Sequence, residues 1–152
     1  RLDYPVKNKT ILLVGAGGAA PAIIVALLNA GAKLLLANRS IAKVKPLIER
    51  FSAIGNIAPY QKGIRIDGLV SCVSEFNLNL FAEFKSDLQP SSFIYDLNYG
   101  DRADGCRHFA LANSIDSFSD GWGMLVGQAA ASFELWTGKR PNLELLLEKA
   151  KG

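Results

Sequence analysis

The sequence predicts a doubly wound α/β fold, a mostly parallel sheet of six strands with helices on both faces. Short apolar runs alternate along the chain with segments whose apolar residues have helical spacing, and this alternation is typical of a parallel sheet. The runs are apolar throughout, as in strands that are buried on both faces. At 152 residues, the chain is long enough for one such domain with its own core.

The first half of the chain supplies two clear strand–helix units. The run ILLVG predicts a strand over 11–15, and the next segment, 20–30, places Ile23, Ile24, Leu27 and Leu28 on one helical face. The run KLLLAN predicts a strand over 33–38, followed by a helix over 42–54. Gly31 and Gly55 stand where a helix C-terminus favours glycine. A weak strand near Ile57 follows, and residues 1–9 are expected to be a lead-in.

The second half continues the alternation with shorter elements. Strands are expected over 68–73, 92–97 and 114–118. Helices are expected over 78–88, 106–112 and 123–137, and residues 139–152 are expected to hold a terminal helix. We therefore interpret residues 1–152 as a single domain.

Composition excludes several classes of protein. The net charge is +3 with no basic block, which disfavours nucleic-acid binding and suits a small anionic ligand. No apolar run approaches the roughly 18 residues of a membrane span, and no signal peptide precedes the first strand. Cys72 and Cys106 are far apart and lack metal-ligand spacing, so no metal site is expected. Reduced thiols in a cytoplasmic chain are favoured over a disulfide.

The turn after the first strand carries the main functional motif. The run Gly15-Ala16-Gly17-Gly18-Ala19-Ala20 fits G-x-G-x-x-G/A between a strand and a helix. In a Rossmann-type fold, Gly15 would allow the tight turn, Gly17 would let the backbone approach a pyrophosphate, and Ala20 would permit close packing. The phosphates would rest on free N–H groups at the helix N-terminus. The alternative is a tight turn that binds no ligand.

The end of the second strand predicts which nucleotide binds. An NAD site places Asp or Glu about 20 residues after the glycine motif, to bind the ribose 2′-hydroxyl. Here the chain has Asn38-Arg39-Ser40, followed by Lys43. A guanidinium binds a 2′-phosphate bidentately, whereas a carboxylate would repel it. The sequence therefore favours NADP over NAD, unless Arg39 is only a solvated loop residue.

Four motifs together resemble the NADP-binding domain of the shikimate dehydrogenase family. They are GAGGAA, NRS followed by Lys43, YDLNY and DGWGMLVGQAA, and the resemblance covers nearly the whole chain. It implies that Arg39 clamps the 2′-phosphate beside Asn38, Ser40 and Lys43. It also implies cofactor contacts from Leu97, Gly121, Met124 and Leu125, and substrate contacts from Tyr99 and Gln128.

Interpreted without the resemblance, the same residues leave alternatives open. Met124, Leu125, Ala129 and Phe133 have the spacing of a core-facing helix stripe. Gln128 on or near that stripe would need polar partners, which a ligand or the protein could supply. Tyr99 is either a ligand contact or a packed ring. His108 is expected on the surface, Cys72 inside a strand and Cys106 partly exposed.

The chain departs from the family pattern in one loop. The family has Asn-Ala-Thr-Ser after the fourth main strand, where hydroxyls touch the cofactor. This chain has Ser71-Cys72-Val73-Ser74-Glu75. Val73 and Ser74 are still expected at the cofactor. Glu75 brings a negative charge toward the phosphates, unless it caps the next helix with its side chain in water.

The resemblance also implies that the catalytic residues lie outside this chain. The family's catalytic Lys and Asp belong to a separate N-terminal domain, so no catalytic residue is expected here and that domain is an expected partner. The implied reaction is reversible NADPH-dependent reduction of 3-dehydroshikimate to shikimate, in aromatic amino acid biosynthesis. The alternatives are a related dehydrogenase acting on quinate or another polyol acid, a non-catalytic NADP sensor, and a structural domain with an empty turn.

Overall fold

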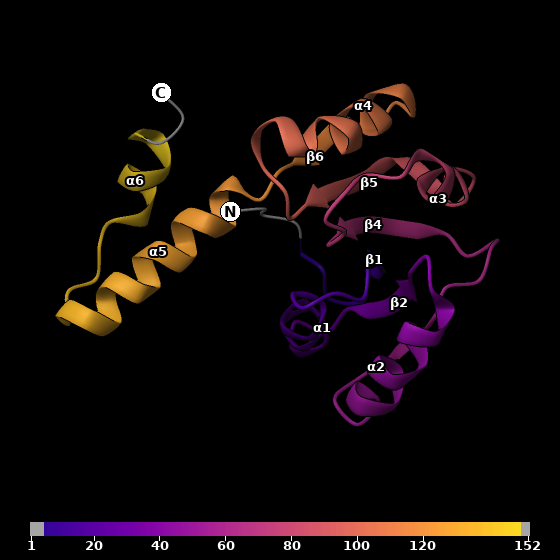
Figure 1. Ribbon diagram of the computed structural model, residues 1–152, viewed down its shortest axis with the longest axis horizontal. Helices are drawn as coiled ribbons and strands as arrows, with labels where there is room; N and C mark the ends of the chain where they lie inside the picture. The colour runs from indigo at the N-terminus through magenta and orange to yellow at the C-terminus, as the bar shows by residue number, and fades with distance from the viewer. Residues whose placement is uncertain (1–4, 150–152) are drawn as a thin grey trace.

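The computed structural model describes residues 5–149, and its centre is one fully parallel sheet (Figure 1). The strand order is β3-β2-β1-β4-β5-β6. The strands are β1 Thr10–Val14, β2 Lys33–Ala37, β3 Ile57–Pro59, β4 Ile66–Ser71, β5 Leu88–Asp96 and β6 Ser117–Ser119. The predicted six-stranded, doubly wound fold is confirmed. The order reverses between β1 and β4, and open sheets of this kind bind ligands at that point.

Helices connect the strands in the predicted alternation. They are α1 Ala20–Asn29, α2 Val44–Phe51, α3 Leu78–Ala82, α4 Asp104–Ala112, α5 Trp122–Thr137 and α6 Leu143–Lys149. Two 3₁₀ turns that the sequence did not predict, Ile41–Lys43 and Gly100–Ala103, lead into α2 and α4.

Several boundaries in the second half differ from the prediction, including those of the strands expected over 68–73 and 92–97, which are Ile66–Ser71 and Leu88–Asp96. The helix expected over 78–88 ends at Ala82, because a turn intervenes and Leu88 already begins β5. Two apolar residues in that segment, Phe84 and Leu88, are buried although one lies in the turn and the other in the strand. The helical spacing of the apolar residues over 78–88 therefore did not mean that all of them lie in one helix. The last strand begins at Ser117 rather than at residue 114.

The core has two parts, one on each face of the sheet. Alternate residues of β1 divide between them, Ile11 and Leu13 on one face and Leu12 and Val14 on the other. The first face is covered by α1 and α2, and the second by α3 and α4. Because both faces are covered, the strands are apolar throughout.

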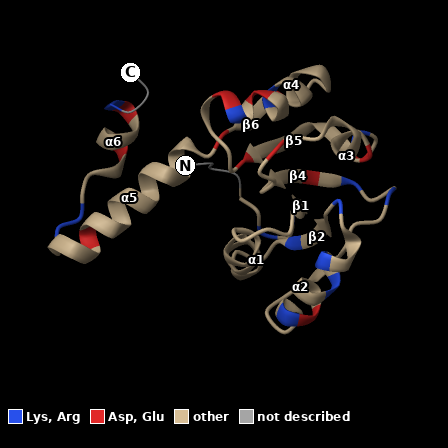
Figure 2. Ribbon diagram, in the orientation of Figure 1, with Lys and Arg blue, Asp and Glu red and all other residues tan. Residues whose placement is uncertain are grey.

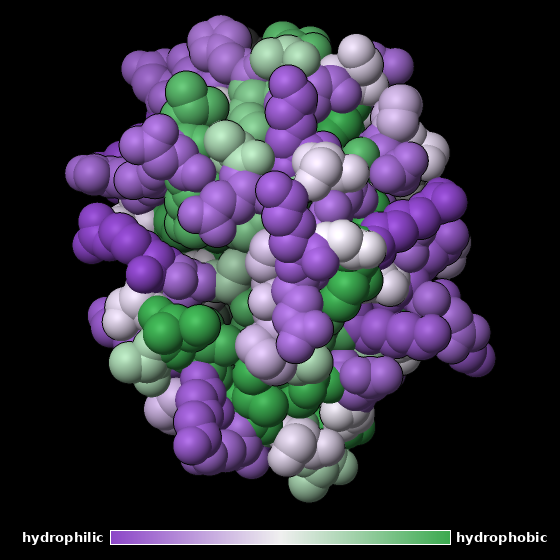
Figure 3. All heavy atoms as spheres, turned by 90° about the vertical axis from the view of Figure 1, so that its right-hand side faces the viewer, coloured by the Kyte–Doolittle hydropathy of each residue, from purple (hydrophilic) through white to green (hydrophobic). Residues whose placement is uncertain are grey.

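α5 and α6 lie apart from this layered body (Figure 1). No residue of α5 is buried, and a Cβ built on Gly123 would lie 4.0 Å from Leu147 of α6, which is an ordinary contact distance. The expected core stripe on this helix is therefore wrong, since Leu125 and Phe133 are 37% and 46% exposed. Figure 3 shows the side of the molecule that lies to the right in Figure 1, away from α5 and α6, where hydrophilic side chains surround several hydrophobic areas.

No helix within residues 5–149 is both long enough and apolar enough to cross a membrane. In the same range, no group of three or more His, Cys, Asp or Glu side chains could hold a metal ion.

Candidate functional site

The turn after β1 requires glycine at its first position. Gly15 has φ +113°, and a Cβ built on it would lie 2.9 Å from Sγ of Cys72 and 3.0 Å from the carbonyl carbon of that residue. Gly17 and Gly18 differ, because a Cβ on either would meet nothing within 4 Å. The first glycine therefore packs against the chain after β4, and the other two face open space.

The N-terminus of α1 is arranged to receive an anion. Its N-cap residue, Ala19, provides no side-chain hydrogen bond, and the first turn contains no acidic residue. Pro21 lies in that turn, where the missing N–H costs nothing. Ala20 is completely buried, so the helix packs closely on the sheet. The uncapped N–H groups and the positive end of the helix dipole favour a phosphate at this position.

The end of β2 brings positive charge to the same place. Arg39, Ser40 and Lys43 are exposed, and Nδ2 of Asn38 donates a 2.9 Å hydrogen bond to the carbonyl of Ser40. Lys43 lies in the 3₁₀ turn before α2 rather than in the first turn of α2, where the sequence placed it. Figure 2 shows Lys and Arg residues distributed along α2 and the segments beside it.

A cleft of about 560 Å³ joins these segments at the carboxyl ends of β1, β2, β4 and β5. Ligand pockets in proteins have volumes of roughly 300–1,000 Å³, so a nucleotide could be accommodated. The cleft is lined by Ala16, Gly17, Gly18, Ala19, Asn38, Arg39, Lys43, Cys72, Val73, Ser74, Glu75, Phe76, Asn77, Leu80, Leu97 and Asn98.

The segment after β4 forms one wall of the cleft. Cys72 lies just beyond the strand and is half-buried, not a strand residue as expected. Its thiol donates to the carbonyl of Gly15 at 3.3 Å, and burial raises its pKa to about 11, so it is protonated at neutral pH. Cys106 was expected to be partly exposed and is completely buried.

Glu75 lines the cleft with an exposed side chain and does not cap α3. The cap is Asn77, whose Oδ1 accepts a 3.0 Å hydrogen bond from the N–H of Leu80. The alternative in which Glu75 caps this helix is therefore wrong. Its carboxylate remains available to act on whatever occupies the cleft.

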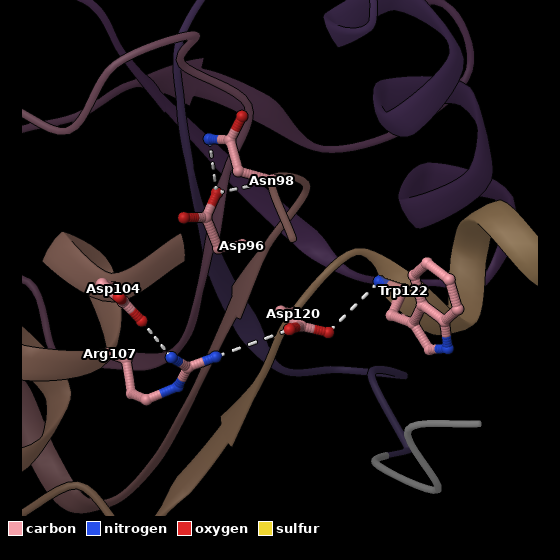
Figure 4. A network of polar contacts seen from close by, with 6 residues as sticks. All are labelled: Asp96, Asn98, Asp104, Arg107, Asp120 and Trp122. Carbon is pink, nitrogen blue, oxygen red and sulfur yellow. Dashed lines mark hydrogen bonds and ion pairs between the residues drawn. The ribbon is translucent and has the colours of Figure 1, made fainter. Parts of the chain in front are cut away.

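The segment after β5 turns around a buried carboxylate, Asp96, which is 1% exposed (Figure 4). Oδ1 of Asp96 accepts hydrogen bonds of 3.1 Å from both the backbone N–H and Nδ2 of Asn98. Burial raises the pKa of the Asp96 carboxyl, the hydrogen bonds from Asn98 oppose that shift, and the charge of Asp120 adds to it. The turn places Leu97 and Asn98 on the cleft wall.

A smaller pocket of about 300 Å³ adjoins the cleft and shares two of its residues. It is lined by Leu97, Asn98, Tyr99, Asp101 and Arg102. The Tyr99 ring is 46% exposed and meets the Trp122 ring edge-on, with the ring centroids 5.8 Å apart. Tyr99 therefore has a packing contact and also a face available to a ligand.

An ion-pair network fixes the end of β6 near this pocket (Figure 4). Arg107 of α4 contacts Asp104 on its own helix and reaches Asp120 at 3.5 Å. Asp120 in turn accepts a 3.2 Å hydrogen bond from the N–H of Trp122, at the start of α5. The start of α5 is thereby linked to α4.

Comparison with known proteins agrees with this geometry. Residues 2–78 match the family model described as shikimate / quinate 5-dehydrogenase, which is half of the chain. The chain belongs to the shikimate/quinate 5-dehydrogenase family. Residues 121–151 also match a model described as the shikimate 5′-dehydrogenase C-terminal domain.

Relatives within this family include two bacterial proteins named shikimate dehydrogenase (NADP(+)). The protein from Pasteurella multocida is 34% identical, and the match covers 98% of this chain and 58% of that protein. The protein from Vibrio atlanticus is 37% identical, with 96% and 55% covered. The chain therefore spans little more than half the length of these relatives.

Two solved structures superpose on the chain over nearly its full length. Shikimate 5-dehydrogenase from Thermus thermophilus, solved in complex with NADP(H) and shikimate, has a TM-score of 0.77 at 27% identity and covers 97% of this chain and 56% of its own. An Ael1 enzyme from Pseudomonas putida has a TM-score of 0.82 at 30% identity, with 97% and 56% covered.

Most of the residues expected at the cofactor in this family member do lie on the cleft. They are Ala16, Gly17, Gly18, Ala19, Asn38, Arg39, Lys43, Val73, Ser74 and Leu97. Gly15 lies beneath the turn, and Ser40 lies beside Arg39 without lining the cleft.

The residues expected from the start of α5 do not line either cavity. Gly121 is buried against Leu97, whereas Met124 is half-exposed and Leu125 and Gln128 are exposed on α5. The structure also adds residues that sequence reasoning missed. Asn98, Phe76, Asn77 and Leu80 line the cleft, and only the polar Asn98 beside the predicted Leu97 carried a signal in the sequence.

Proposed function

We propose that this chain is the NADP-binding part of a shikimate dehydrogenase-like oxidoreductase. The reaction is the reversible NADPH-dependent reduction of 3-dehydroshikimate to shikimate, in aromatic amino acid biosynthesis. The observation that carries the proposal is that one cleft contains the open glycines at the start of α1 together with Arg39 and Lys43. The relatives named for NADP and the complex with NADP(H) and shikimate support it.

Different residues of the cleft would bind different parts of the cofactor. The N–H groups of Gly17, Gly18 and Ala19 would hold the pyrophosphate at the positive end of α1. Arg39 and Lys43 would hold the 2′-phosphate by charge-assisted hydrogen bonds, with Asn38 and Ser40 shaping the loop around it. Val73, Ser74 and Leu97 would then border the nicotinamide half, which supplies the hydride when the reduced cofactor is bound.

The substrate would lie beyond Leu97, in the smaller pocket beside Tyr99. Residues from the start of α5 would also line this pocket, namely Gly121, Met124, Leu125 and Gln128. They would do so once a further domain, corresponding to the additional length of the relatives, covers that helix. The exposed apolar residues of α5 and α6, among them Leu135 and Trp136, which are 85% and 84% exposed, support such a covering domain. That domain would supply the proton-transfer groups.

Two alternatives keep specific support. The matching family description includes quinate as well as shikimate, so quinate or a similar polyol acid is a candidate substrate. Val73 and Glu75 on the cleft wall favour a non-catalytic NADP sensor, because Val73 replaces a hydroxyl and Glu75 introduces a charge of the same sign as the phosphates.

The free thiols of Cys72 and Cys106 support the inference of a reducing, cytoplasmic location.

The test of the proposed function is cofactor choice. Arg39→Ala and Lys43→Ala should each weaken NADP binding by roughly tenfold or more while NAD binding changes little, because only NADP carries the 2′-phosphate. Isothermal titration calorimetry with both nucleotides measures this. Lys45→Ala is the matched control, since Lys45 is two residues further along, is exposed, and pairs with Glu49 outside the cleft.

Equal affinity of the unmodified chain for NADP and NAD would overturn the choice of cofactor. Binding of neither nucleotide would overturn the proposed function as a whole.

A further inference from the structure

Asn98 makes hydrogen bonds to three separate segments of the site. Within its own turn it donates twice to Oδ1 of Asp96, as described above. Its Nδ2 also donates a 2.8 Å hydrogen bond to the carbonyl of Val73, in the segment after β4. Its own carbonyl accepts a 2.8 Å hydrogen bond from the N–H of Gly121, after β6.

These bonds join the carboxyl-end segments of three neighbouring strands. β4, β5 and β6 are adjacent in the sheet, but the paired register of β4 and β5 ends at Ser71 and Asp96. Beyond that pair, within residues 5–149, the ladder is extended by one backbone hydrogen bond, which the N–H of Leu97 donates to the carbonyl of Ser71 at 2.9 Å. The segment after β4 is therefore held to this turn by the Asn98 side chain, whereas the segment after β6 is joined to it by the backbone hydrogen bond of Gly121.

The close approach of the third segment depends on the same turn. A Cβ on Gly121 would lie 2.0 Å from the carbonyl oxygen of Leu97, so a glycine is required where the start of α5 contacts the turn. Asp96 is buried, which excludes water from the centre of the arrangement. The Asn98 amide thus has its donors aimed at two fixed acceptors.

We propose that Asn98 is a positioning residue for the nicotinamide half of the cofactor, because it holds the Val73 segment at a fixed distance from Leu97. The inference rests on the proposed function and refines it. Val73, Leu97 and Asn98 line the cleft, and Leu97, Asn98 and Tyr99 line the adjoining pocket. Asn98 therefore stands between the cofactor space and the substrate space and sets the width of both.

The test separates the two ends of the cofactor. Asn98→Leu keeps the approximate size of the side chain and removes both donors, leaving the Val73 carbonyl and the buried Asp96 carboxylate without these partners. We expect the dissociation constant for NADP to rise by about tenfold, the effect of one or two lost hydrogen bonds. The dissociation constant for adenosine 2′,5′-bisphosphate should change by less than about twofold, because that ligand occupies only the Arg39 end.

Asn113→Leu is the matched control. Asn113 also donates one amide hydrogen bond to a backbone carbonyl, that of Phe109 at 2.7 Å, but lies at the end of α4 and lines neither cavity. This variant should leave the affinity for both ligands unchanged. Should Asn98→Leu fail to fold, Asn98→Ala removes the same donors without adding bulk and is titrated in its place.

A second readout needs no nucleotide. In Asn98→Leu the N–H groups of residues 74–76, next to the Val73 carbonyl that loses its partner, should exchange with solvent faster than in the unmodified chain, as followed by amide hydrogen exchange. In Asn113→Leu their exchange should be unchanged.

Equal weakening of NADP and adenosine 2′,5′-bisphosphate, or no weakening of either, would overturn the positioning role while the proposed function stands. Unchanged exchange in Asn98→Leu would overturn it as well. Failure of the unmodified chain to bind NADP would instead overturn the proposed function, and the positioning role with it.

Discussion

At the scale of single residues, Glu75 is the side chain that fits its site least well. It is exposed, lines the cleft beside Ser74 and leaves the capping of α3 to Asn77. A carboxylate in a cleft that binds a nucleotide acts against the negative charge of the phosphates. Solvent around an exposed side chain screens much of this repulsion, so the effect is moderate.

We expect Glu75→Ser to tighten NADP binding by roughly tenfold at low salt, which is about the effect of a partly screened charge repulsion. This gain in affinity should shrink as the salt concentration rises, because salt then screens the repulsion between Glu75 and the phosphates in the unmodified chain as well. Titration of both proteins at low and high salt measures it. Glu83→Ser serves as the control, since Glu83 is exposed at the end of α3 and does not line the cleft. An unchanged dissociation constant for NADP in Glu75→Ser would place Glu75 outside the bound cofactor's reach.

At the scale of elements, the turn between β1 and α1 assigns different roles to its glycines. Gly15 is a requirement of the fold, because its φ of +113° and the contact with Cys72 exclude a side chain. Gly17 is a requirement of the site, because its surroundings are open and its backbone lies on the cleft. A motif of similar residues thus contains one structural and one ligand-facing position.

These roles predict opposite results for the same substitution. Gly15→Ala should lower the free energy of unfolding by about 2 kcal/mol or more, from backbone strain and the clash with Cys72. Gly17→Ala should leave the free energy of unfolding nearly unchanged and weaken NADP binding by roughly tenfold, since the methyl group would occupy space that the pyrophosphate needs. Urea unfolding and calorimetry measure the two quantities. A strongly destabilised Gly17→Ala, or a stable Gly15→Ala, would contradict this division.

At the scale of the whole molecule, the layered body and the pair α5–α6 differ in how they are stabilised. The sheet is covered on both faces, whereas Leu135 and Trp136 of α5 and three leucines of α6 remain exposed, namely Leu143, Leu145 and Leu146. Exposed apolar surface of this kind marks an interaction site. The chain spans only 58% and 55% of the length of its two named relatives, which supports the proposal that a further domain covers this surface.

We therefore expect this chain alone to bind NADPH and not to turn over. With saturating NADPH and 3-dehydroshikimate it should show no oxidation of NADPH above background, because general acid–base groups, which contribute roughly 10²–10⁴-fold, are expected on the partner domain. Absorbance at the NADPH band follows the reaction, and NADPH fluorescence in the same sample verifies that the cofactor is bound. Measurable turnover would mean that the catalytic residues lie within this chain.

The sequence alone determined the parts of this protein that depend on local chemistry. Uniformly apolar runs predicted the strands, because a strand that is covered on both faces has no polar side. The glycine turn and Arg39 predicted the end of the cleft that we propose for the phosphates, because a close backbone approach needs glycine and bidentate binding of a phosphate needs a guanidinium. Those residues line one cleft in the structure.

The tertiary structure decided what depends on residues far apart in the chain. Helical spacing could not show that the helix after Asn77 stops at Ala82, or that α5 has no buried residue, because an apolar residue packs equally well from a turn or against a domain outside the chain. The proposed role of Asn98 could not be predicted from the sequence either, since its hydrogen-bond partner Val73 lies 25 residues earlier in the chain. Only the pairing of β4 with β5 brings the two together, at the end of the cleft that we propose for the nicotinamide.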